Sequence, residues 1–224
     1  MIILTGGAGM IGSMIAWHLN RILNKKQFVI VDEFLVPEQE KNIDKRDFID
    51  LIGKNELPNY LKSNSQIEAI IHMGAISATT ENNFNNLLKS NIRYSQFLWD
   101  WASANQVPFI YASSAATYGD GEFGYKDNSD ALLNYKPLNA YGYSKHFFDM
   151  WVQNQLQQNL PKPPKWFGLK FFNVYGPNEY HKGRMASVVY HAFNQFKKDG
   201  EVRLFKSKNP EYKDGMQLRD FIYV

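Results

Sequence analysis

A glycine-rich turn follows directly after the first apolar segment of the chain. Residues 1–5 read Met-Ile-Ile-Leu-Thr, and Gly6, Gly9 and Gly12 follow at intervals of three. The amphipathic stretch after Gly12 predicts a helix to about Leu23. Glycines at these positions permit a tight turn and let an anion approach the N-terminus of the helix. A strand, a glycine turn and a helix in this order predict a dinucleotide-binding βαβ unit.

Short apolar runs alternate with longer amphipathic stretches along the rest of the chain, which favours a parallel sheet. We predict strands at 28–31, 46–51, 69–73, 109–114, 166–172 and 202–205, and helices at 55–64, 84–104, 141–160 and 186–198. The expected fold class is α/β, a Rossmann-type doubly wound parallel sheet with helices on both faces. We assign residues 1–172 to this domain. We interpret residues 173–224 as the beginning of a small, truncated substrate-binding domain.

Composition excludes several classes of function. The 224 residues carry a net charge of +3 with scattered basic residues, so we expect neither nucleic-acid binding nor attachment to an anionic membrane. The absence of cysteine excludes disulfides and thiolate metal sites, and we expect no metal. No apolar run is long enough to span a bilayer, and the first residues are unlike a signal peptide. We therefore expect a cytoplasmic protein.

Acidic residues end the second predicted strand. Asp32 and Glu33 stand about twenty positions after the glycines, where a carboxylate commonly binds the adenosine ribose. Two carboxylates favour NAD because a 2′-phosphate would meet like charge. Basic residues that would offset this charge follow at Lys41, Lys45 and Arg46, so NAD and NADP both stay open. Asp50, at the end of the third predicted strand, is a candidate for the adenine edge.

A Tyr-x-x-x-Lys pair marks the predicted chemistry. Tyr141 and Lys145 are four residues apart, which places both side chains on one face of a helix. We expect the ammonium to lower the pKa of the phenol by about 3 units, so that Tyr141 removes a proton from a sugar hydroxyl. Ser114, at the end of the fifth strand, would share that proton. His72 lies inside an apolar run and is interpreted as a buried, satisfied histidine.

Four motifs together resemble the extended short-chain dehydrogenase/reductase superfamily. They are Thr5-Gly6-Gly7-Ala8-Gly9-x-Ile11-Gly12-Ser13, Ser113-Ser114-Ala115, Tyr141-x-x-x-Lys145 and Phe172-Asn173-Val174-Tyr175-Gly176-Pro177. Three further segments resemble the branch that epimerises C6 of an ADP-linked heptose for the lipopolysaccharide inner core. They are Gly74-Ala75-x-Ser77-x-Thr79-Thr80-Glu81, the run from Tyr111 to Gly119, and His181-Lys182-Gly183-x-Met185-Ala186-Ser187-Val188.

The resemblance implies a role for each matched position. Tyr141 and Lys182 would be the two acid/base residues, Lys145 would hold the nicotinamide ribose, and Ser114 would orient the keto oxygen. The implied cofactor is NADP or NAD, tightly held, and the implied partner is the nucleotide-sugar ADP-heptose. The other cofactor-lining residues would be Met10, Ile11, Asp32, Glu33, Lys54, Met73, Gly74, Ala75, Ile76, Ser77, Asn91 and Val174. The substrate would contact Asn173, Arg184, His191, Phe205, Lys206, Ser207, Lys208 and Arg219. A homo-oligomer that uses helices 84–104 and 141–160 is expected by analogy.

Three departures and two alternatives bear on this interpretation. Glu33 replaces an uncharged residue and puts the usual NADP preference in doubt. Residues 207–217 form a longer loop than the family carries, and the family continues past residue 224. The alternatives are another nucleotide-sugar 4-epimerase or 4,6-dehydratase of the superfamily, and a non-catalytic NAD(P)-binding sensor. Ala115 and Ala116 replace the acidic pair of the dehydratases, and the Tyr–Lys pair argues against a sensor.

Overall fold

A six-stranded parallel sheet forms the centre of the computed structural model, which describes residues 1–33, 36–127, 129–207 and 210–224. Its strands lie in the order β3-β2-β1-β4-β5-β6, which is the classic order of a Rossmann fold. They are β1 (Ile2–Thr5), β2 (Phe28–Val31), β3 (Asp50–Ile52), β4 (Ala69–His72), β5 (Phe109–Ser114) and β6 (Trp166–Phe171). The predicted fold class is confirmed.

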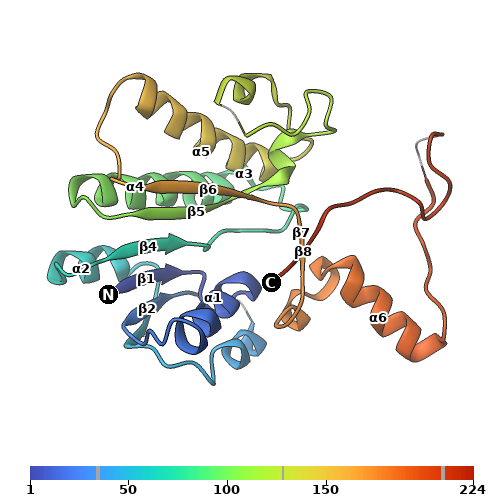
Figure 1. Ribbon diagram of the computed structural model, residues 1–224, viewed down its shortest axis with the longest axis horizontal. Helices are drawn as coiled ribbons and strands as arrows, with labels where there is room; N and C mark the ends of the chain where they lie inside the picture. The colour runs from blue at the N-terminus through green and yellow to red at the C-terminus, as the bar shows by residue number, and fades with distance from the viewer. Residues whose placement is uncertain (34–35, 128, 208–209) are drawn as a thin grey trace.

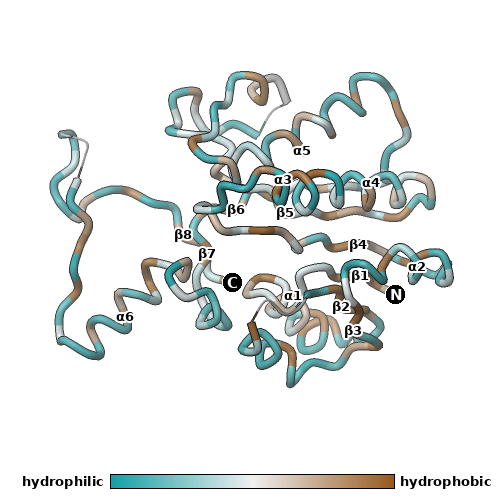
Figure 2. The backbone as a smooth tube through the Cα atoms, turned by 180° about the vertical axis from the view of Figure 1, so that it is seen from behind, coloured by the Kyte–Doolittle hydropathy of each residue, from teal (hydrophilic) through white to brown (hydrophobic). Residues whose placement is uncertain are grey.

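Both faces of the sheet are covered, which explains why its central strands are apolar throughout. Ile3, Val29 and Val31 pack on one face with Trp99 and Phe109. The other face buries Ile2, Leu4, Phe28 and Ile30 against Ala16 and Leu19 of the first helix. In Figure 1, α5 lies beside β5 and β6, while α1 lies beside β1 and β2. Figure 2 shows strong hydrophobic colour where β1, β2 and β3 gather.

The helices follow the predicted alternation, with one interruption. The α-helices are α1 (Met10–Arg21), α2 (Leu57–Ser63), α3 (Phe84–Leu87), α4 (Tyr94–Ala104), α5 (Ala140–Gln157) and α6 (Val188–Asp199). The predicted helix 84–104 is divided by a π-helical turn, η2 (Leu88–Arg93). Short 3₁₀ segments are η1 (Pro37–Asn42), η3 (Ala115–Tyr118), η4 (Ser129–Asn134) and η5 (Tyr180–Met185). No helix in the described ranges is long and apolar enough to cross a membrane.

Two strand predictions were wrong. The third strand begins at Asp50 instead of ending there, and Asp50 pairs with Val29 near the amino end of β2. The exposed Asp50 side chain therefore lies at the opposite end of this short strand from the glycine turn, which argues against a contact with adenine. Residues 202–205 form no strand. Leu204 and Phe205 are 68% and 71% exposed, so the apolar pattern that predicted a strand has no neighbouring sheet to pair with.

The last part of the chain forms a second, two-stranded parallel sheet. β7 (Asn173–Tyr175) pairs with β8 (Phe221–Tyr223), and α6 lies between them in the sequence. Figure 1 shows α6 and the chain after it extending away from one end of the large sheet. The α6 residues Phe193 and Phe196 are more than half exposed. The division into domains at residue 172 stays a prediction.

Candidate functional site

The glycine turn and the start of α1 form an open, uncapped helix N-terminus. Gly6 has φ of +68°, and a Cβ atom there would lie 2.5 Å from the backbone nitrogen of Gly74. A Cβ at Gly12 would collide with the carbonyl of Gly6. Gly9 is the N-cap residue, and neither a side-chain cap nor an acidic residue occupies the first turn of α1. This turn fits a bound pyrophosphate, because its N–H groups and the helix dipole favour an anion.

Asp32 supports the glycine turn from the end of β2. Its Oδ2 accepts a 2.8 Å hydrogen bond from the backbone N–H of Ala8, and its Oδ1 accepts one of 2.8 Å from Glu33. Burial raises the pKa of the Asp32 carboxyl, and these backbone donors oppose the shift. Asp32 therefore fixes the shape of the turn, while the exposed Glu33 side chain stands beside it at the expected ribose position.

A buried hydrogen-bond chain through His72 holds the loop after β4. The His72 Nδ1 lies 2.6 Å from Thr5 Oγ1, and its Nε2 lies 2.8 Å from Ser95 Oγ. Ser95 donates its own proton to the Asn91 carbonyl, so the imidazole proton belongs on Nε2. Thr5 Oγ1 also accepts from the Gly74 N–H. Burial lowers the pKa of His72 to about 3. The interpretation of His72 as a buried, satisfied residue is confirmed.

Asn91 holds the same loop from the other side. Its Oδ1 accepts from the Ile76 N–H and its Nδ2 donates to the Ile76 carbonyl, both at 2.9 Å. Nδ2 also donates to Ser144 Oγ at 2.9 Å. Asn91 is only 1% exposed, so it supports the loop from Met73 to Ser77 from behind. Ser144 was missed in the sequence, although it lies one residue before Lys145.

Lys54 lies near the same edge, after β3. Its amine donates to Ser90 Oγ at 3.1 Å and lies 4.6 Å from the ring centroid of Tyr94. Burial lowers the pKa of Lys54, and the negative charge of Glu33 opposes that shift. A cation is therefore close enough to Glu33 to offset part of its charge at the predicted ribose position.

Ser114, Tyr141 and Lys145 come together where β5 ends and α5 begins. Asn139 caps α5 by accepting from the Gly142 N–H at 2.8 Å. The Lys145 amine donates a 2.8 Å hydrogen bond to the Ala112 carbonyl, and burial lowers the pKa of this amine to about 8. Burial raises the pKa of the Tyr141 phenol, and a hydrogen bond from Ser114 opposes the shift.

The expected lowering of the Tyr141 pKa by Lys145 is corrected by this geometry. The pKa of Tyr141 is raised, and the charge of Lys145 is not among its causes. The amine is directed to the β5 backbone, and desolvation of the phenol outweighs the Ser114 hydrogen bond. Ser114, not Lys145, is thus the neighbour that favours the phenolate here.

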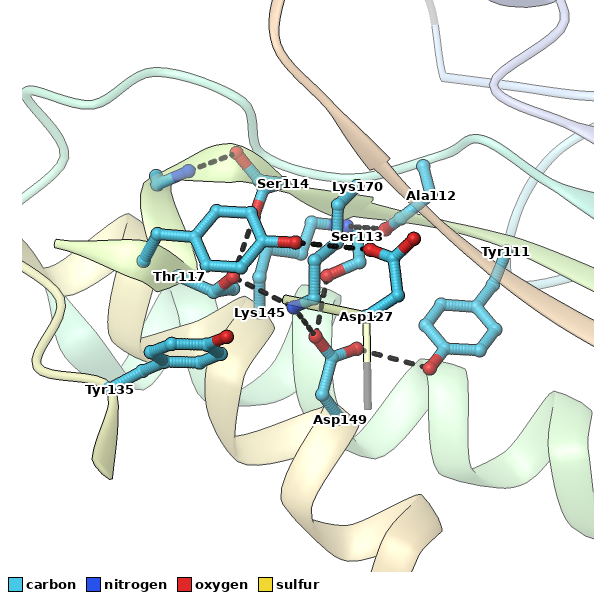
Figure 3. A network of polar contacts seen from close by, with 12 residues as sticks. Tyr111, Ala112, Ser113, Ser114, Thr117, Asp127, Tyr135, Lys145, Asp149 and Lys170 are labelled. Atoms are coloured by element: carbon cyan, nitrogen blue, oxygen red, sulfur yellow. Dashed lines mark hydrogen bonds and ion pairs between the residues drawn. The ribbon is translucent and has the colours of Figure 1, made fainter. Parts of the chain in front are cut away.

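Two charged residues that sequence reasoning missed, the buried Asp149 and the partly buried Lys170, lie close to Ser113 and Thr117 (Figure 3). Asp149 Oδ1 accepts from the Tyr111 hydroxyl at 3.0 Å, and its Oδ2 accepts from the Ser113 hydroxyl at 2.7 Å. The Lys170 amine lies 2.6 Å from Asp149 Oδ2 and donates to Thr117 Oγ1 at 2.8 Å. Two signals were present: Asp149 follows Tyr141 and Lys145 at the same helical spacing, and Lys170 is a charge inside an apolar strand.

Lys182 lies in another part of the fold, and none of its contacts with the described residues joins it to Ser114, Tyr141 or Lys145. It lies on η5, which packs against η1: the Tyr180 hydroxyl donates to Asn42 Oδ1 at 2.6 Å, and His181 Nδ1 lies 3.3 Å from Asn42 Nδ2. Just before η5, the Asn178 side chain donates to Ser13 Oγ of α1 at 3.0 Å. Burial lowers the pKa of Lys182, and Glu179 opposes the shift.

The remaining substrate candidates lie on the C-terminal segment and are mostly exposed. Val174, the last cofactor candidate, lies in β7, and the substrate candidate Asn173 donates its side-chain amide to the Asp220 carbonyl at 3.0 Å. His191 lies on α6 with its ring 5.9 Å from that of Tyr190. The backbone N–H of Ser207 donates to Asp214 Oδ1 at 2.7 Å. Arg184, Phe205, Lys206 and Arg219 are exposed, and Lys208 lies outside the described residues.

The sheet order, the glycine turn and the Ser–Tyr–Lys cluster together define a dinucleotide-binding fold of the short-chain dehydrogenase/reductase type. The sequence profile of the NAD dependent epimerase/dehydratase family matches residues 2–224. The chain belongs to this family, which confirms the superfamily predicted from the motifs.

Several known proteins are similar to the chain. It is 53% identical to an ADP-L-glycero-D-manno-heptose-6-epimerase of Fusobacterium nucleatum, over 100% of the chain and 68% of that protein. The crystal structure of the Helicobacter pylori ADP-L-glycero-D-manno-heptose-6-epimerase matches with a TM-score of 0.81 and 30% identity, over 99% of this chain and 68% of that one. A Bacillus cereus UDP-glucuronic acid 4-epimerase in complex with NAD, at 24% identity and TM-score 0.75 over 99% and 68% of the two chains, shares the fold.

Proposed function

We propose that the chain inverts C6 of the heptose in ADP-glycero-manno-heptose by transient oxidation to a ketone and re-reduction. The observation that carries this proposal is the 53% identity to a heptose 6-epimerase over the whole chain, joined to the Ser114–Tyr141–Lys145 cluster. The proposed product is the heptose donor for the lipopolysaccharide inner core. The chain spans about two thirds of the length of these relatives.

On one side of the substrate carbon, Tyr141 is the proposed proton carrier. Its phenol is protonated at neutral pH because burial raises the pKa, so it is ready to donate to a ketone oxygen. Ser114 favours the phenolate of Tyr141 and would bind the same substrate oxygen. Lys145 is proposed to hold the ribose next to the nicotinamide. The bound dinucleotide supplies the acceptor and donor of the C6 hydrogen.

Lys182 is the proposed proton carrier on the opposite side. Tyr141 belongs to α5, which packs on β5, whereas the segment that carries Lys182 packs on η1 and on α1. The elements that carry the two residues thus pack on different parts of the fold. Burial lowers the pKa of Lys182, which increases the neutral fraction able to accept a proton. Inversion needs a proton partner for each face of the carbon, and Tyr141 and Lys182 are the two proposed partners.

The proposed cofactor is NAD or NADP, and the same residues would bind either dinucleotide. The carboxylates of Asp32 and Glu33 favour the ribose diol of NAD, while the nearby Lys54 ammonium partly offsets Glu33. Asp32 already accepts two backbone hydrogen bonds. Glu33 and Lys54 are therefore proposed to set the preference between the two dinucleotides.

A homo-oligomer that uses the helices within 84–104 and 141–160 is part of the proposal by analogy with the superfamily. Sedimentation velocity of the purified protein tests it: a single monomeric species would contradict it.

The direct test is to incubate the protein with ADP-heptose of one C6 configuration and both dinucleotides, and to follow the C6 proton by NMR. The proposal predicts the second diastereomer and no net change in the dinucleotide. UDP-glucose and UDP-glucuronic acid in parallel reactions test the alternative 4-epimerase function. A 4-keto-6-deoxy product would support the dehydratase alternative. Dinucleotide binding with no product from any sugar would support the sensor alternative.

A further inference from the structure

Four successive residues at the end of β5 are each linked to the buried polar network described above (Figure 3). Tyr111 and Ser113 donate to the Asp149 carboxylate. Between them, the Ala112 carbonyl accepts from Lys145. The Ser114 carbonyl accepts from Thr117 Oγ1 at 2.8 Å, and Thr117 in turn accepts from Lys170. The position of the strand end relative to α5 is therefore fixed by side chains and not by packing alone.

Asp149 and Lys170 stand at the centre of these links. Asp149 is 6% exposed, and the Lys170 side chain is 15% exposed. Their 2.6 Å contact joins α5 to β6, and the two residues together reach the side chains of Tyr111, Ser113 and Thr117. A largely buried charge pair with this many hydrogen bonds has its charges compensated, so it constrains geometry without leaving a lone buried charge.

We propose that Asp149 and Lys170 are a positioning pair, which holds the Ser114 end of β5 against α5 so that Ser114 and Lys145 stay aligned with Tyr141. The pair touches none of the expected reacting atoms, so its effect on turnover passes through these three residues. This inference rests on the proposed function, but its structural part does not depend on the sugar. The Asp149 carboxylate also lies one helical turn after Lys145 on α5.

The charges around Lys145 make the proposal testable without substrate. Titratable groups close to this cluster are His72 on β4, Tyr111 on β5, Tyr118 on η3 with its partner Asp127, Lys170 on β6, and Tyr141, His146 and Asp149 on α5. Asp149 supports the charged form of Lys145, whereas burial opposes it. Removing the carboxylate and removing its Lys170 partner should thus shift the Lys145 titration in opposite directions.

The experiment compares Asp149→Asn, Lys170→Met and Lys170→Arg in the full chain, with the exposed Asp100→Asn on α4 as the matched control. The titration of Lys145 is followed by NMR of its labelled side chain, assigned from the spectrum of Lys145→Arg. We expect the pKa of Lys145 to fall by about half a unit or more in Asp149→Asn and to rise in Lys170→Met. Lys170→Arg and Asp100→Asn should resemble the parent protein.

Turnover provides the second readout. Asp149→Asn and Lys170→Met should lower kcat about tenfold or more with KM changed much less, and Lys170→Arg should restore most of kcat. Folded variants with unchanged kcat, or with a Lys145 pKa that is unchanged or shifts in the same direction in both, would overturn the proposal. If Asp149→Asn does not fold, Ser113→Ala and Tyr111→Phe each remove one donor and carry the same expectation for kcat. If the parent protein itself does not epimerise ADP-heptose, the proposed function is overturned, and the NMR titration still tests the positioning pair.

Discussion

The Lys145 amine donates a 2.8 Å hydrogen bond to the carbonyl of Ala112, two residues before the Ser114 hydroxyl that contacts Tyr141. The lysine is thus anchored to the strand that carries Ser114 while it shares a helix with Tyr141. Burial of this amine lowers its pKa to about 8, well below the value of about 10.4 for an unfolded chain. The charged form of Lys145 therefore destabilises the folded protein.

Replacing Lys145 should therefore stabilise the protein. Between pH 8 and 10 the unfolded chain binds a proton at this lysine that the folded chain does not, so the unfolding free energy should rise with pH. The slope should reach at most about 1.4 kcal/mol per pH unit. In Lys145→Met this rise should be absent and the melting temperature at pH 7 higher, with turnover lost. Urea unfolding from pH 7 to 10 measures it; an equal slope in both proteins would contradict the buried charge.

Tyr141 and Lys182 should each be required for epimerisation. Tyr141→Phe removes the proton while keeping the ring, and Lys182→Met removes the amine while keeping most of the chain length. Loss of a positioned acid or base should lower kcat by about 100-fold or more in each variant. Dinucleotide binding, measured by fluorescence, should be nearly unchanged, which separates lost chemistry from a lost site. Full epimerisation in both variants would show that the acid/base assignment is wrong.

Glu33 should influence the choice between NAD and NADP. The Glu33→Gln variant removes a negative charge beside the expected 2′-position and leaves the Lys54 ammonium less compensated. The ratio of NADP affinity to NAD affinity should rise by about tenfold. The reverse charge change, Lys54→Met, should lower that ratio. Isothermal titration with both dinucleotides measures the affinity ratio. Equal ratios in the parent protein and the two variants would show that Glu33 and Lys54 do not act at the ribose.

His72 should make the protein sensitive to mild acid. Its folded pKa of about 3 lies below the unfolded value of 6.5, so protonation favours the unfolded chain and stability is lost as the pH falls below 6.5. Between pH 7 and 5 this residue alone should cost about 2 kcal/mol of unfolding free energy. His146 and His181 shift in the same direction, so the comparison of the parent with His72→Gln isolates this contribution. An unchanged pH dependence in His72→Gln would contradict it.

The sequence predicted those parts of the fold whose cause is local. β1, the glycine turn and α1 form where the pattern placed them, because Gly6 and Gly12 occupy positions that no side chain fits. Asp50 was misplaced because a three-residue strand gives too short a pattern to fix its ends. The apolar 202–205 segment was predicted as a strand, but periodicity cannot tell whether a partner strand is present.

The sequence predicted which residues of the site come together, but it did not predict how their pKa values shift. Tyr141, Lys145 and Ser114 come together as expected, yet the pKa of Tyr141 is raised. Helical spacing places a lysine next to a tyrosine, but it does not reveal that the amine turns to the Ala112 carbonyl. Asp149 and Lys170 are 21 residues apart, and their contact depends on the pairing of β5 with β6.

C6 is proposed to be inverted through oxidation and re-reduction within one site. Epimerisation of ADP-heptose in D₂O, with the isotope at C6 of the product read by NMR, tests this route. We expect inverted product whose C6 carries its original hydrogen, because that hydrogen leaves the carbon and returns without exchanging with solvent. Deuterium at C6 of the inverted product would instead show that a proton is removed from carbon, and would rule out the hydride route.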